Sequence, residues 1–349
     1  MTKLEVIDPR AAPAWEEFVA SRPDATAFHT TAWASALADT YPYQPRYYVA
    51  FDDAGKIIAG IPTMLVRSRL TGTRIIGLPF SDFCAPLLQD DAVSARLVDA
   101  LREDAERERC RYVELRGDGG CAPLEKGFQR VSDFVQHEID LDRPIAVIQA
   151  SLHRSARRGI RKAEEEGVKV RLSSDLADLQ HFYRLHVPTR RKHGLPPTPY
   201  AFFCRLHRAL IAPGHGCLLV AEFQGRIIAV DICTWHRDVI YGKFQAWDTR
   251  FRSLGHDLLL WHEILLGKER GCVRLNLGRS STDNEGLRSY KSKWGAEEHA
   301  LPYLYYPELQ GFASEAGDSP RRRLLSAAIR HTPSALLPRL SAILYGHFA

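Results

Sequence analysis

The sequence predicts an α/β fold in which one structural unit occurs twice. The first sign is a pair of antiparallel hairpins, each made of two apolar strands around a polar turn. They occupy residues 47–62 and 218–230, and the turn of the second is one residue shorter. Because a similar hairpin returns in a similar context, the two halves are expected to share one topology.

A helix and a strand follow each hairpin and give two further signs of duplication. Residues 92–109 and 256–270 have the apolar spacing of amphipathic helices, and each is followed by an alternating strand that ends near a glycine. The helix–strand junctions are also alike, since residues 108–110 and 269–272 both begin with Glu-Arg and end with Cys. A chance match of the two hairpins is the competing interpretation.

The remaining segments complete the first half in chain order. A broken helical region at residues 13–41 precedes the first hairpin. The strands expected outside the hairpin lie at residues 74–78, 111–115 and 134–139. Pro144 and its neighbours then interrupt the pattern, which places a boundary there. The predicted domains are residues 1–143, residues 144–310 and a basic tail at residues 311–349.

Composition excludes several classes of protein. With 349 residues, of which 45% are hydrophobic, the chain can bury a sizeable core, and it has no apolar run long enough for a membrane span. The N-terminus does not read as a secretory signal. Seven cysteines without a Cys-x-x-Cys pair are typical of buried thiols in a reducing compartment. The fourteen histidines form no ligand pattern, so we expect no metal site.

A basic helix is predicted at residues 146–167, with four arginines on one of its faces. Spacings of three and four residues bring these side chains together: Arg154, Arg157, Arg158 and Arg161. Such a cluster of positive charge suits an anionic partner, including RNA. The alternative is a solvated face that is partly neutralised by the acidic residues 164–166.

The most informative stretch begins with an alternating strand at residues 273–277. Gly278 is expected to end this strand, so that Arg279 enters a loop of small polar residues. Lys291 and Lys293 follow on a short helical segment, between two aromatic residues. The stretch therefore offers fixed cations beside the end of a strand.

Four segments of the second half resemble motifs of the FemAB family, whose two halves are both of the GNAT acyltransferase type. They span residues 155–168, 189–203, 241–264 and 276–295. The likeness is weaker in the first half, and it is strongest to the FemAB-like proteins associated with exosortase and exopolysaccharide systems. The long helical arm of some aminoacyl-transferring members has no counterpart here, and Leu37 or a neighbour replaces a lysine of those enzymes. The resemblance implies tandem GNAT-like domains, each a mixed sheet flanked by helices.

The resemblance also implies roles for the two basic segments. Acyl transfer to an amine needs a held carbonyl, a route for the amine proton and a donor for the developing oxyanion. Lys291 matches the family's aromatic-Lys-x-x-aromatic-Gly ending and would act on the carbonyl or a phosphate of the acyl donor, with Lys293 as a second candidate. Arg157 and its neighbours would bind the diphosphate of a nucleotide- or lipid-linked sugar precursor. The alternative for Lys291 is a lysine that is simply exposed on a helix.

Arg279 is a further candidate, which could bind a carboxylate or phosphate or pair with a nearby aspartate. Residues 252–257 occupy the place of the loop that binds coenzyme A pyrophosphate in ordinary GNAT proteins, but Asp257 would repel a pyrophosphate and suits a helix N-cap. Three residues nearby could line the acceptor pocket or simply pack in the sheet: Tyr241, Trp247 and Asp248. Asp231 and Asp283 could accept a proton, although the sequence indicates no partner for either.

The basic tail reads as two short amphipathic helices interrupted by Pro333 and Pro338. Its arginines are Arg321, Arg322, Arg323, Arg330 and Arg339, and no acidic residue follows Asp318. Such helices suit the surface of an anionic membrane. Docking onto the protein's own surface is the alternative.

The predicted function is that of an N-acyltransferase that transfers an aminoacyl or acyl group to an amine of a peptidoglycan or exopolysaccharide precursor. We expect no tightly bound cofactor, with aminoacyl-tRNA or acyl-CoA as the donor. The alternatives are an acyl-CoA-dependent enzyme that acts on an amino sugar, and a non-catalytic protein that binds an envelope precursor or RNA. The expected location is the cytoplasm, with peripheral contact to the inner face of the membrane through the tail.

Overall fold

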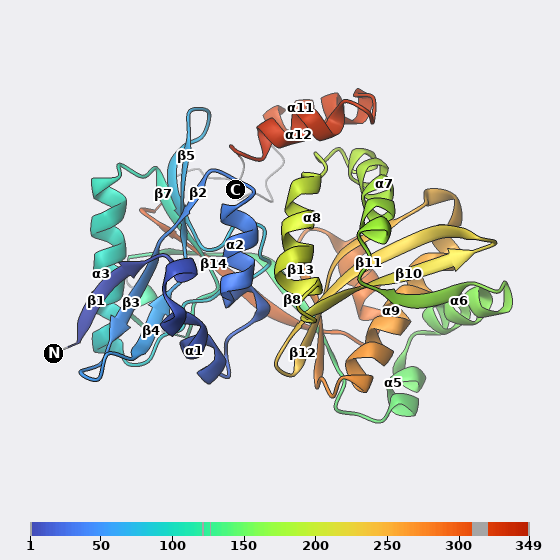
Figure 1. The fold of residues 1–349 in the computed structure, drawn as a ribbon, viewed down its shortest axis with the longest axis horizontal. Helices are drawn as coiled ribbons and strands as arrows, with labels where there is room; N and C mark the ends of the chain where they lie inside the picture. Colours follow the sequence, from blue (N-terminus) through green and yellow to red (C-terminus); the bar gives the residue numbers. More distant parts are fainter. Residues whose placement is uncertain (1, 121, 126, 309–319, 348–349) are drawn as a thin grey trace. The chain divides into compact units, whose positions relative to one another are not determined.

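The computed structural model describes residues 2–120, 122–125, 127–308 and 320–347 (Figure 1). The chain divides into two compact units, the first made of Met1–Phe134, Ala300–Gly317 and Ile343–Ala349, and the second of Val135–His299 and Asp318–Ala342. Two strands, β8 (Gln129–Asp140) and β14 (Glu297–Tyr306), contribute residues to both units. The predicted domain limit after residue 310 lies outside the described residues, and the limit after residue 143 stays a prediction.

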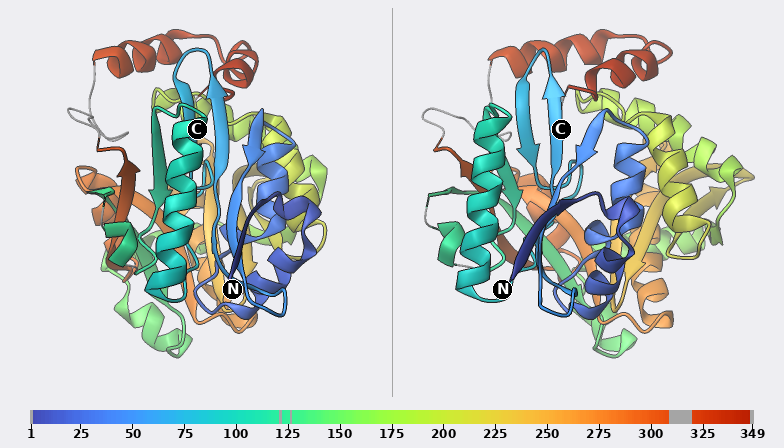
Figure 2. Two further views of the ribbon diagram at one scale, coloured as in Figure 1. Left: turned by 90° about the vertical axis from the view of Figure 1, so that its left-hand side faces the viewer. Right: turned by 60° about the vertical axis from the view of Figure 1, so that its left-hand side comes forward.

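The first unit carries α3 against its strands (Figure 2). Its strands are ordered β1-β3-β4 in one sheet and β2-β5-β6-β7-β14 in the other. Asp90 caps α3 by accepting a hydrogen bond from the Val93 amide. The strands are β1 (Lys3–Ile7), β2 (Tyr43–Pro45), β3 (Tyr47–Phe51), β4 (Ile57–Ile61), β5 (Met64–Ser68), β6 (Gly72–Ile76) and β7 (Tyr112–Arg116). The α-helices are α1 (Pro13–Ser21), α2 (Thr31–Ala38), α3 (Asp91–Arg107) and α4 (Ala122–Glu125).

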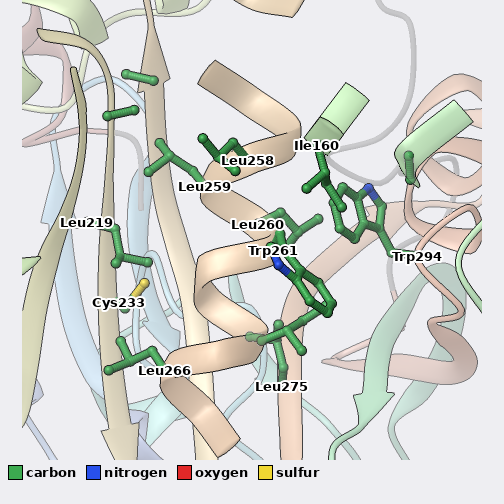
Figure 3. Packing of buried hydrophobic residues seen from close by; sticks show 14 of the residues in the cluster. Ile160, Leu219, Cys233, Leu258, Leu259, Leu260, Trp261, Leu266, Leu275 and Trp294 are labelled. Atoms are coloured by element: carbon green, nitrogen blue, oxygen red, sulfur yellow. The ribbon is translucent and has the colours of Figure 1, made fainter. Parts of the chain in front are cut away.

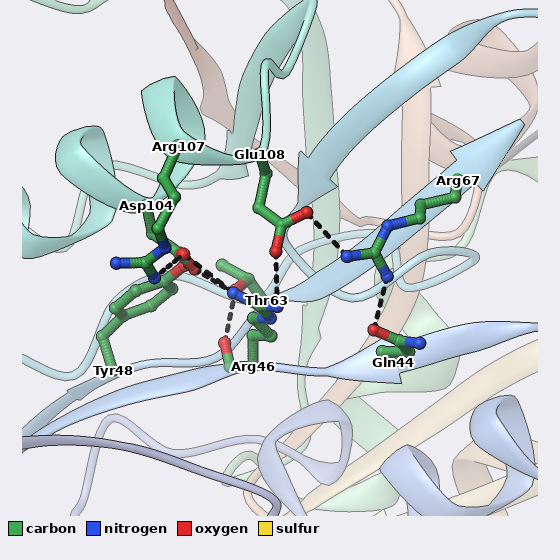
Figure 4. Close-up of polar contacts among 8 residues, drawn as sticks. All are labelled: Gln44, Arg46, Tyr48, Thr63, Arg67, Asp104, Arg107 and Glu108. Carbon is green, nitrogen blue, oxygen red and sulfur yellow. Dashed lines mark hydrogen bonds and ion pairs between the residues drawn. The ribbon is translucent and has the colours of Figure 1, made fainter.

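An ion-pair network holds α3 to the strands of the first unit (Figure 4). Arg46 lies 2.6 Å from Asp104 and 2.7 Å from Glu108, and Arg67 lies 2.6 Å from Glu108. Burial raises the pKa of Asp104, but hydrogen bonds from Tyr48 and Arg46 outweigh it and leave that pKa lowered. These charged side chains are matched with one another, so they have a structural role.

The second unit orders its strands β8-β13-β12-β11-β10-β9. Helices α7 and α8 lie toward one face of β10–β12 and α9 lies on the other (Figure 1). The remaining strands are β9 (Lys169–Ser173), β10 (Gly216–Phe223), β11 (Arg226–His236), β12 (Val239–Trp247) and β13 (Arg274–Ser281). The α-helices before the tail are α5 (Ile145–Ser151), α6 (Arg154–Glu165), α7 (Leu176–Lys192), α8 (Tyr200–Leu206), α9 (Arg252–Glu269) and α10 (Glu285–Ser292). The tail forms α11 (Pro320–His331) and α12 (Leu337–Leu344).

The predicted duplication is present in the topology. In the first unit the hairpin β3–β4 lies in the three-stranded sheet, while β5 pairs antiparallel with β6 in the other sheet and α3 connects β6 to the parallel strand β7. In the second unit the hairpin β10–β11 is followed by β12, and α9 connects β12 to the parallel strand β13. Strand, helix and parallel strand form the same crossover in each half.

The helix predicted at residues 146–167 is wrong in one respect, because two helices occupy this segment. Leu152 has extended backbone angles and separates α5 from α6. The His153 side chain then caps α6 by accepting a hydrogen bond from the Ser155 amide. Capping by a histidine side chain is an unusual signal, and apolar spacing alone does not reveal it.

The core of the second unit lies between α9, α6 and the strands (Figure 3). Ile160 and Trp294 contribute to it together with the apolar face of α9, and Trp294 is 1% exposed. Close packing of α6 on α9 requires Gly159, because a Cβ atom there would overlap the carboxylate of Asp257. The helix that carries the arginines is thereby fixed on α9.

Candidate functional site

Strands β12 and β13 are parallel neighbours for only three residue pairs. The last pair is Tyr241 with Asn276, although both strands continue, to Trp247 and Ser281. Just beyond this pair, the register of β12 with β11 shifts so that Lys243 is an extra residue, a β-bulge. We call residues 241–244 of β12 and 276–279 of β13 the branch. A bulge beside the end of a parallel pairing turns aside backbone N–H and C=O groups that would otherwise form hydrogen bonds with the neighbouring strand.

Lys291 lies at the branch and is 6% exposed. Its Nζ donates hydrogen bonds to the carbonyl oxygens of Gly278 and Arg279, over 3.0 and 3.1 Å. Two consecutive carbonyls turn toward one ammonium because Gly278 has a φ of +70°, which glycine adopts readily. The interpretation of Lys291 as an exposed helix lysine is therefore wrong.

The prediction that Gly278 ends its strand is also wrong. β13 continues through Gly278 to Ser281, so Arg279 lies on the strand and not in a loop. The Asn276 side chain accepts a hydrogen bond from the Gly278 amide over 2.8 Å and donates one to Glu138 over 3.0 Å. This side chain stabilises a kink inside the strand, where the sequence pattern indicated a stop.

The arginine helix begins beside the end of the helix that carries Lys291. The His153 amide, at the N-cap of α6, donates to the Lys293 carbonyl over 2.8 Å. Lys293 thus joins the two helices through its backbone, and its side chain is exposed. The structure places the start of α6 and the end of α10 next to one another within the second unit.

The predicted arginine face is exposed, because the opposite face of α6 packs in the core through Ala156, Ile160 and Ala163. The exposed arginines are Arg154, Arg157, Arg158 and Arg161. Across the described part of the chain, none of these four forms an ion pair. The guanidinium groups of this face are therefore exposed and lie outside ion-pair distance of any described acid.

The three residues predicted to line an acceptor pocket differ in their surroundings. Tyr241 is buried in the last parallel pair of the branch. Trp247 is half-buried at the end of β12, with its ring centroid 4.8 Å from that of His256. Asp248 accepts hydrogen bonds from the Arg250 guanidinium, which lowers the pKa of that carboxyl. Asp248 therefore already has a cationic partner.

The segment compared with a coenzyme A loop lies inside α9, which begins at Arg252. Asp257 is not an N-cap, contrary to our expectation, since the cap position is Phe251. The Tyr290 hydroxyl lies 2.6 Å from His256 Nδ1 and donates to Asp257 over 3.3 Å. Gly255 packs against Ala229 of β11, where a Cβ atom would come within 2.9 Å of the alanine methyl. Helix packing therefore explains the glycine of this segment, and the aspartate accepts a hydrogen bond from Tyr290.

Sequence reasoning missed half of a buried acid pair next to the branch. Asp231 on β11 and Glu263 on α9 are 1% and 3% exposed. Gln245 of β12 donates to Asp231 Oδ2 over 2.7 Å. Gly242 leaves room for the pair, because a Cβ atom at this position would overlap Glu263 Oε2. Because residue 242 has no side chain, the Glu263 carboxyl lies directly against the backbone of the branch at Gly242.

Burial changes the acidity of both carboxyls. It raises the pKa of Asp231 to about 6, and it raises the pKa of Glu263 well above its usual value with a further contribution from Asp231. Two buried acids in contact hold a proton between them at neutral pH. A signal was present in the sequence, since each acid interrupts an apolar run, in β11 and on the buried face of α9. The other proton acceptor considered, Asp283, is exposed and accepts a hydrogen bond from Ser281.

The opposite face of β12 carries an aromatic cluster under α7 and α8. The Phe244 ring lies 5.2 Å from that of Phe203, which lies 5.1 Å from the His186 ring. Burial holds the pKa of His186 well below its usual value, so this side chain is neutral. Phe244 and Gln245 are successive residues of β12, so their side chains point to opposite faces of the sheet. Phe244 contacts the aromatic cluster and Gln245 contacts Asp231, so one strand contacts both groups.

Neither metal ligation nor membrane spanning has support in the described ranges. No group of three or more His, Cys, Asp or Glu side chains there could hold a metal ion. None of the helices in these ranges combines the length and apolar character that crossing a bilayer requires.

Comparison with known proteins relates part of the second unit to a domain family. Residues 150–292 match the acetyltransferase (GNAT) domain family. These residues are similar to a GNAT acyltransferase domain. The match covers α6 to α10 and includes the branch, Lys291 and the acid pair. The GNAT domain makes the chain an acyltransferase, as predicted.

Solved structures extend the likeness to both units. The structure of FemX is similar with a TM-score of 0.70 at 14% identity, over 93% of this chain and 100% of that one. L-PGS from Bacillus licheniformis gives 0.58 at 14%, over 97% and 99%. A tandem GNAT protein of the clavulanic acid pathway gives 0.54 at 11%, over 87% and 98%. The predicted tandem GNAT fold and the FemAB resemblance are thus confirmed at the level of fold. No curated protein sequence matches the chain.

Proposed function

We propose that the chain transfers an acyl or aminoacyl group to an amine of a phosphate-bearing cell-envelope precursor. The observation that carries this proposal is the buried cation at the branch of a GNAT domain. A positive charge removed from water stabilises a developing oxyanion or a donor phosphate more strongly than an exposed one does. Lys291 also fixes the kink at Gly278, so it both supplies the charge and shapes the backbone around it.

The acceptor would bind along α6. The guanidinium groups of Arg154, Arg157, Arg158 and Arg161 are exposed and form no ion pair with a described residue, and planar guanidinium groups bind phosphate through paired hydrogen bonds. A diphosphate linked to a nucleotide or a lipid supplies the opposite charge. The hydrogen bond from the His153 amide to the Lys293 carbonyl joins this face to the helix of Lys291. Arg279 of the branch is the proposed second cation of the donor side.

The acid pair is the proposed proton acceptor. As the amine nitrogen forms its bond to the acyl carbon, it loses a proton, which the ionised carboxyl of the pair takes up. When the bond from the acyl carbon to the leaving oxygen or sulfur breaks, the proton goes to that atom. The pair ends the cycle with the single proton it began with.

The donor is either aminoacyl-tRNA or acyl-CoA. The FemAB resemblance favours the first, while the GNAT family match is equally compatible with the second. The test is to incubate the purified chain with radiolabelled aminoacyl-tRNA and, separately, with labelled acetyl-CoA, each with an extract of envelope precursors. Label that moves to an amine from one donor identifies that donor. If neither donor yields labelled product while precursors still bind, the chain is a binding protein and the proposal fails.

A further inference from the structure

The tail is docked on the protein's own surface at two places, as the alternative interpretation of this segment expected. In the second unit, Ile329 of α11 is 1% exposed and Leu337 of α12 is fully buried. Both pack with Val187 and Tyr183 of α7. In the first unit, residues 345–347 contact side chains of β2, β5 and β6. Apolar packing explains the first place, whereas the second combines aromatic rings with polar groups.

The Tyr345 ring lies among aromatic side chains of the first unit, and the residue is 6% exposed. Its ring centroid lies 5.2 Å from that of Phe80 and 6.2 Å from that of Tyr41, and the planes of the two tyrosine rings differ by only 20°. Phe80 has a φ of +61°, a backbone conformation that costs energy for a residue with a large side chain. Backbone strain of this kind is concentrated at binding sites and active sites.

Three polar side chains of the first unit donate hydrogen bonds to the backbone of this segment. The Tyr43 hydroxyl donates to the Tyr345 carbonyl. The His347 carbonyl accepts from Thr71 Oγ1 over 2.9 Å and from Arg74 Nη2 over 2.8 Å. Two donors, one of them cationic, therefore converge on a single carbonyl oxygen.

Arg74 is the unusual member of this set, because its charge is buried. The residue is 5% exposed and forms no ion pair with a described residue. It also donates to the Tyr112 hydroxyl over 3.3 Å, while its Nε has no hydrogen-bond partner in the described part of the chain. Nε and Nη2 form one edge of a guanidinium group, and this edge can bind both oxygens of a carboxylate. The tail thus supplies one neutral oxygen where an anionic group would bind more strongly.

We propose that this site on the first unit binds the C-terminus of a peptide, with the terminal carboxylate in the place of the His347 carbonyl. The carboxylate would form paired hydrogen bonds with Arg74 and a third with Thr71, and it would compensate the buried charge. An aromatic side chain two residues before the peptide's end would occupy the place of Tyr345. Residues 345–347 are then an intramolecular competitor, with an effective concentration on the order of millimolar. This inference does not depend on the proposed reaction.

The test uses Tyr345→Ser in the full chain, which removes the ring that holds the tail in the site. The probe is an N-terminally labelled Tyr-Gly-His tripeptide, with either a free C-terminal carboxylate or a C-terminal amide, and its binding is followed by fluorescence anisotropy. We expect Tyr345→Ser to bind the free acid at least tenfold more tightly than the amide. The unsubstituted chain should bind the acid at least tenfold more weakly than this variant does, because its own tail competes.

Two further substitutions, each added to Tyr345→Ser, assign the preference to the site. Arg74→Met should make the acid and the amide bind equally. Thr71→Val should weaken binding of the acid about fivefold, because one hydrogen bond is lost. Thermal unfolding checks each variant, and Thr71→Val, at a half-buried position, tests the site even if Arg74→Met does not fold. Arg96→Ser, at an exposed position of α3, is the control and should leave binding of both peptides unchanged.

Equal binding of the acid and the amide by Tyr345→Ser, or binding of neither, would overturn the proposal. A preference for the acid that survives Arg74→Met would do so as well, and so would undiminished binding of the acid by Thr71→Val. Inorganic phosphate is the remaining competitor to be tested. If it displaced the acid peptide at concentrations as low as those at which the peptide itself binds, the site would recognise a simple anion and not a peptide end.

Discussion

Asp231 and Glu263 lie buried side by side, and each keeps one oxygen, Oδ1 and Oε2, without a hydrogen-bond partner in the described part of the chain. Two ionised carboxylates would repel one another in such surroundings, so the pair keeps a proton. The pair is therefore a single titrating unit.

The first prediction concerns stability between about pH 4 and pH 6. Burial raises the pKa of Asp231 to about 6 in the folded chain, so its contribution to stability is fully present below the unfolded pKa of about 4 and is lost as the pH rises through the folded pKa. The size of this change is about 3 kcal/mol at most. Denaturant unfolding of the wild type should therefore give a lower free energy at pH 7 than at pH 5.

Asp231→Asn is the variant that tests this origin. Its amide does not ionise, so the decline between pH 5 and pH 7 should become small. Aspartates paired with arginine, such as Asp104, have lowered pKa values and act in the opposite direction, at lower pH. Parallel curves for the variant and the wild type would show that the decline does not come from ionisation of Asp231.

A second prediction concerns the glycine that makes room for the pair. Gly242→Ala places a methyl group onto the buried Glu263 carboxyl and should destabilise the fold by about 1–3 kcal/mol. Combining it with Glu263→Asp, which shortens the acid, should recover part of the loss in a double-mutant cycle. Gly286→Ala is the control, because a Cβ atom there meets nothing closer than 3.9 Å. Additive losses would mean that the two residues are not in contact.

The third prediction separates the two lysines of α10. Lys291→Met leaves the Gly278 and Arg279 carbonyls without their ammonium partner, so we expect a loss of about 2–4 kcal/mol in unfolding free energy and loss of acyl transfer. Lys293→Met removes an exposed charge and should change stability by less than about 0.5 kcal/mol. Acyl transfer that persists undiminished in a folded Lys291→Met protein would refute the assigned role.

The fourth prediction concerns the arginines of α6. Arg157→Ser should raise the KM for a phosphate-bearing acceptor about tenfold with a smaller change in kcat, because a charged hydrogen bond to the substrate is lost. The KM of the wild type should increase with salt more steeply than that of the variant. Arg96→Ser on α3 is the control for an exposed arginine elsewhere. An equal effect of both substitutions would argue against a phosphate site on α6.

Much of the fold could be predicted from the pattern of apolar and turn residues in the sequence. Alternation and turn residues located the hairpins, and apolar spacing located α3 and α9, because burial of one face sets those periods. The errors came where one side chain overrides a pattern. Gly278 does not end β13, since Asn276 and Lys291 stabilise its kink, and His153 divides a helix that the spacing presents as continuous.

The candidate site divides in the same way. Lys291 and the arginines were found because a motif or a charge pattern marks them. The acid pair was found only in part, because a contact between β11 and α9 joins residues 32 positions apart, 231 and 263, and no spacing rule connects them. The fit of Gly242 against Glu263 is likewise a property of packing, which becomes visible only once strand and helix are placed together.

Helix α7 connects the tail helix α11 to strand β12, so a compound bound at α11 could inhibit the protein away from its substrates. Its Tyr183 touches the apolar cluster of Ile329 and also stacks 6.1 Å from His186, whose aromatic neighbours reach Phe244 on β12. A small molecule that displaced α11 from this helix would disturb the aromatic packing of α7 against β12, next to the branch, without competing for either substrate. Such a compound would be insensitive to high precursor concentrations, and substitutions around Lys291 would offer no resistance to it.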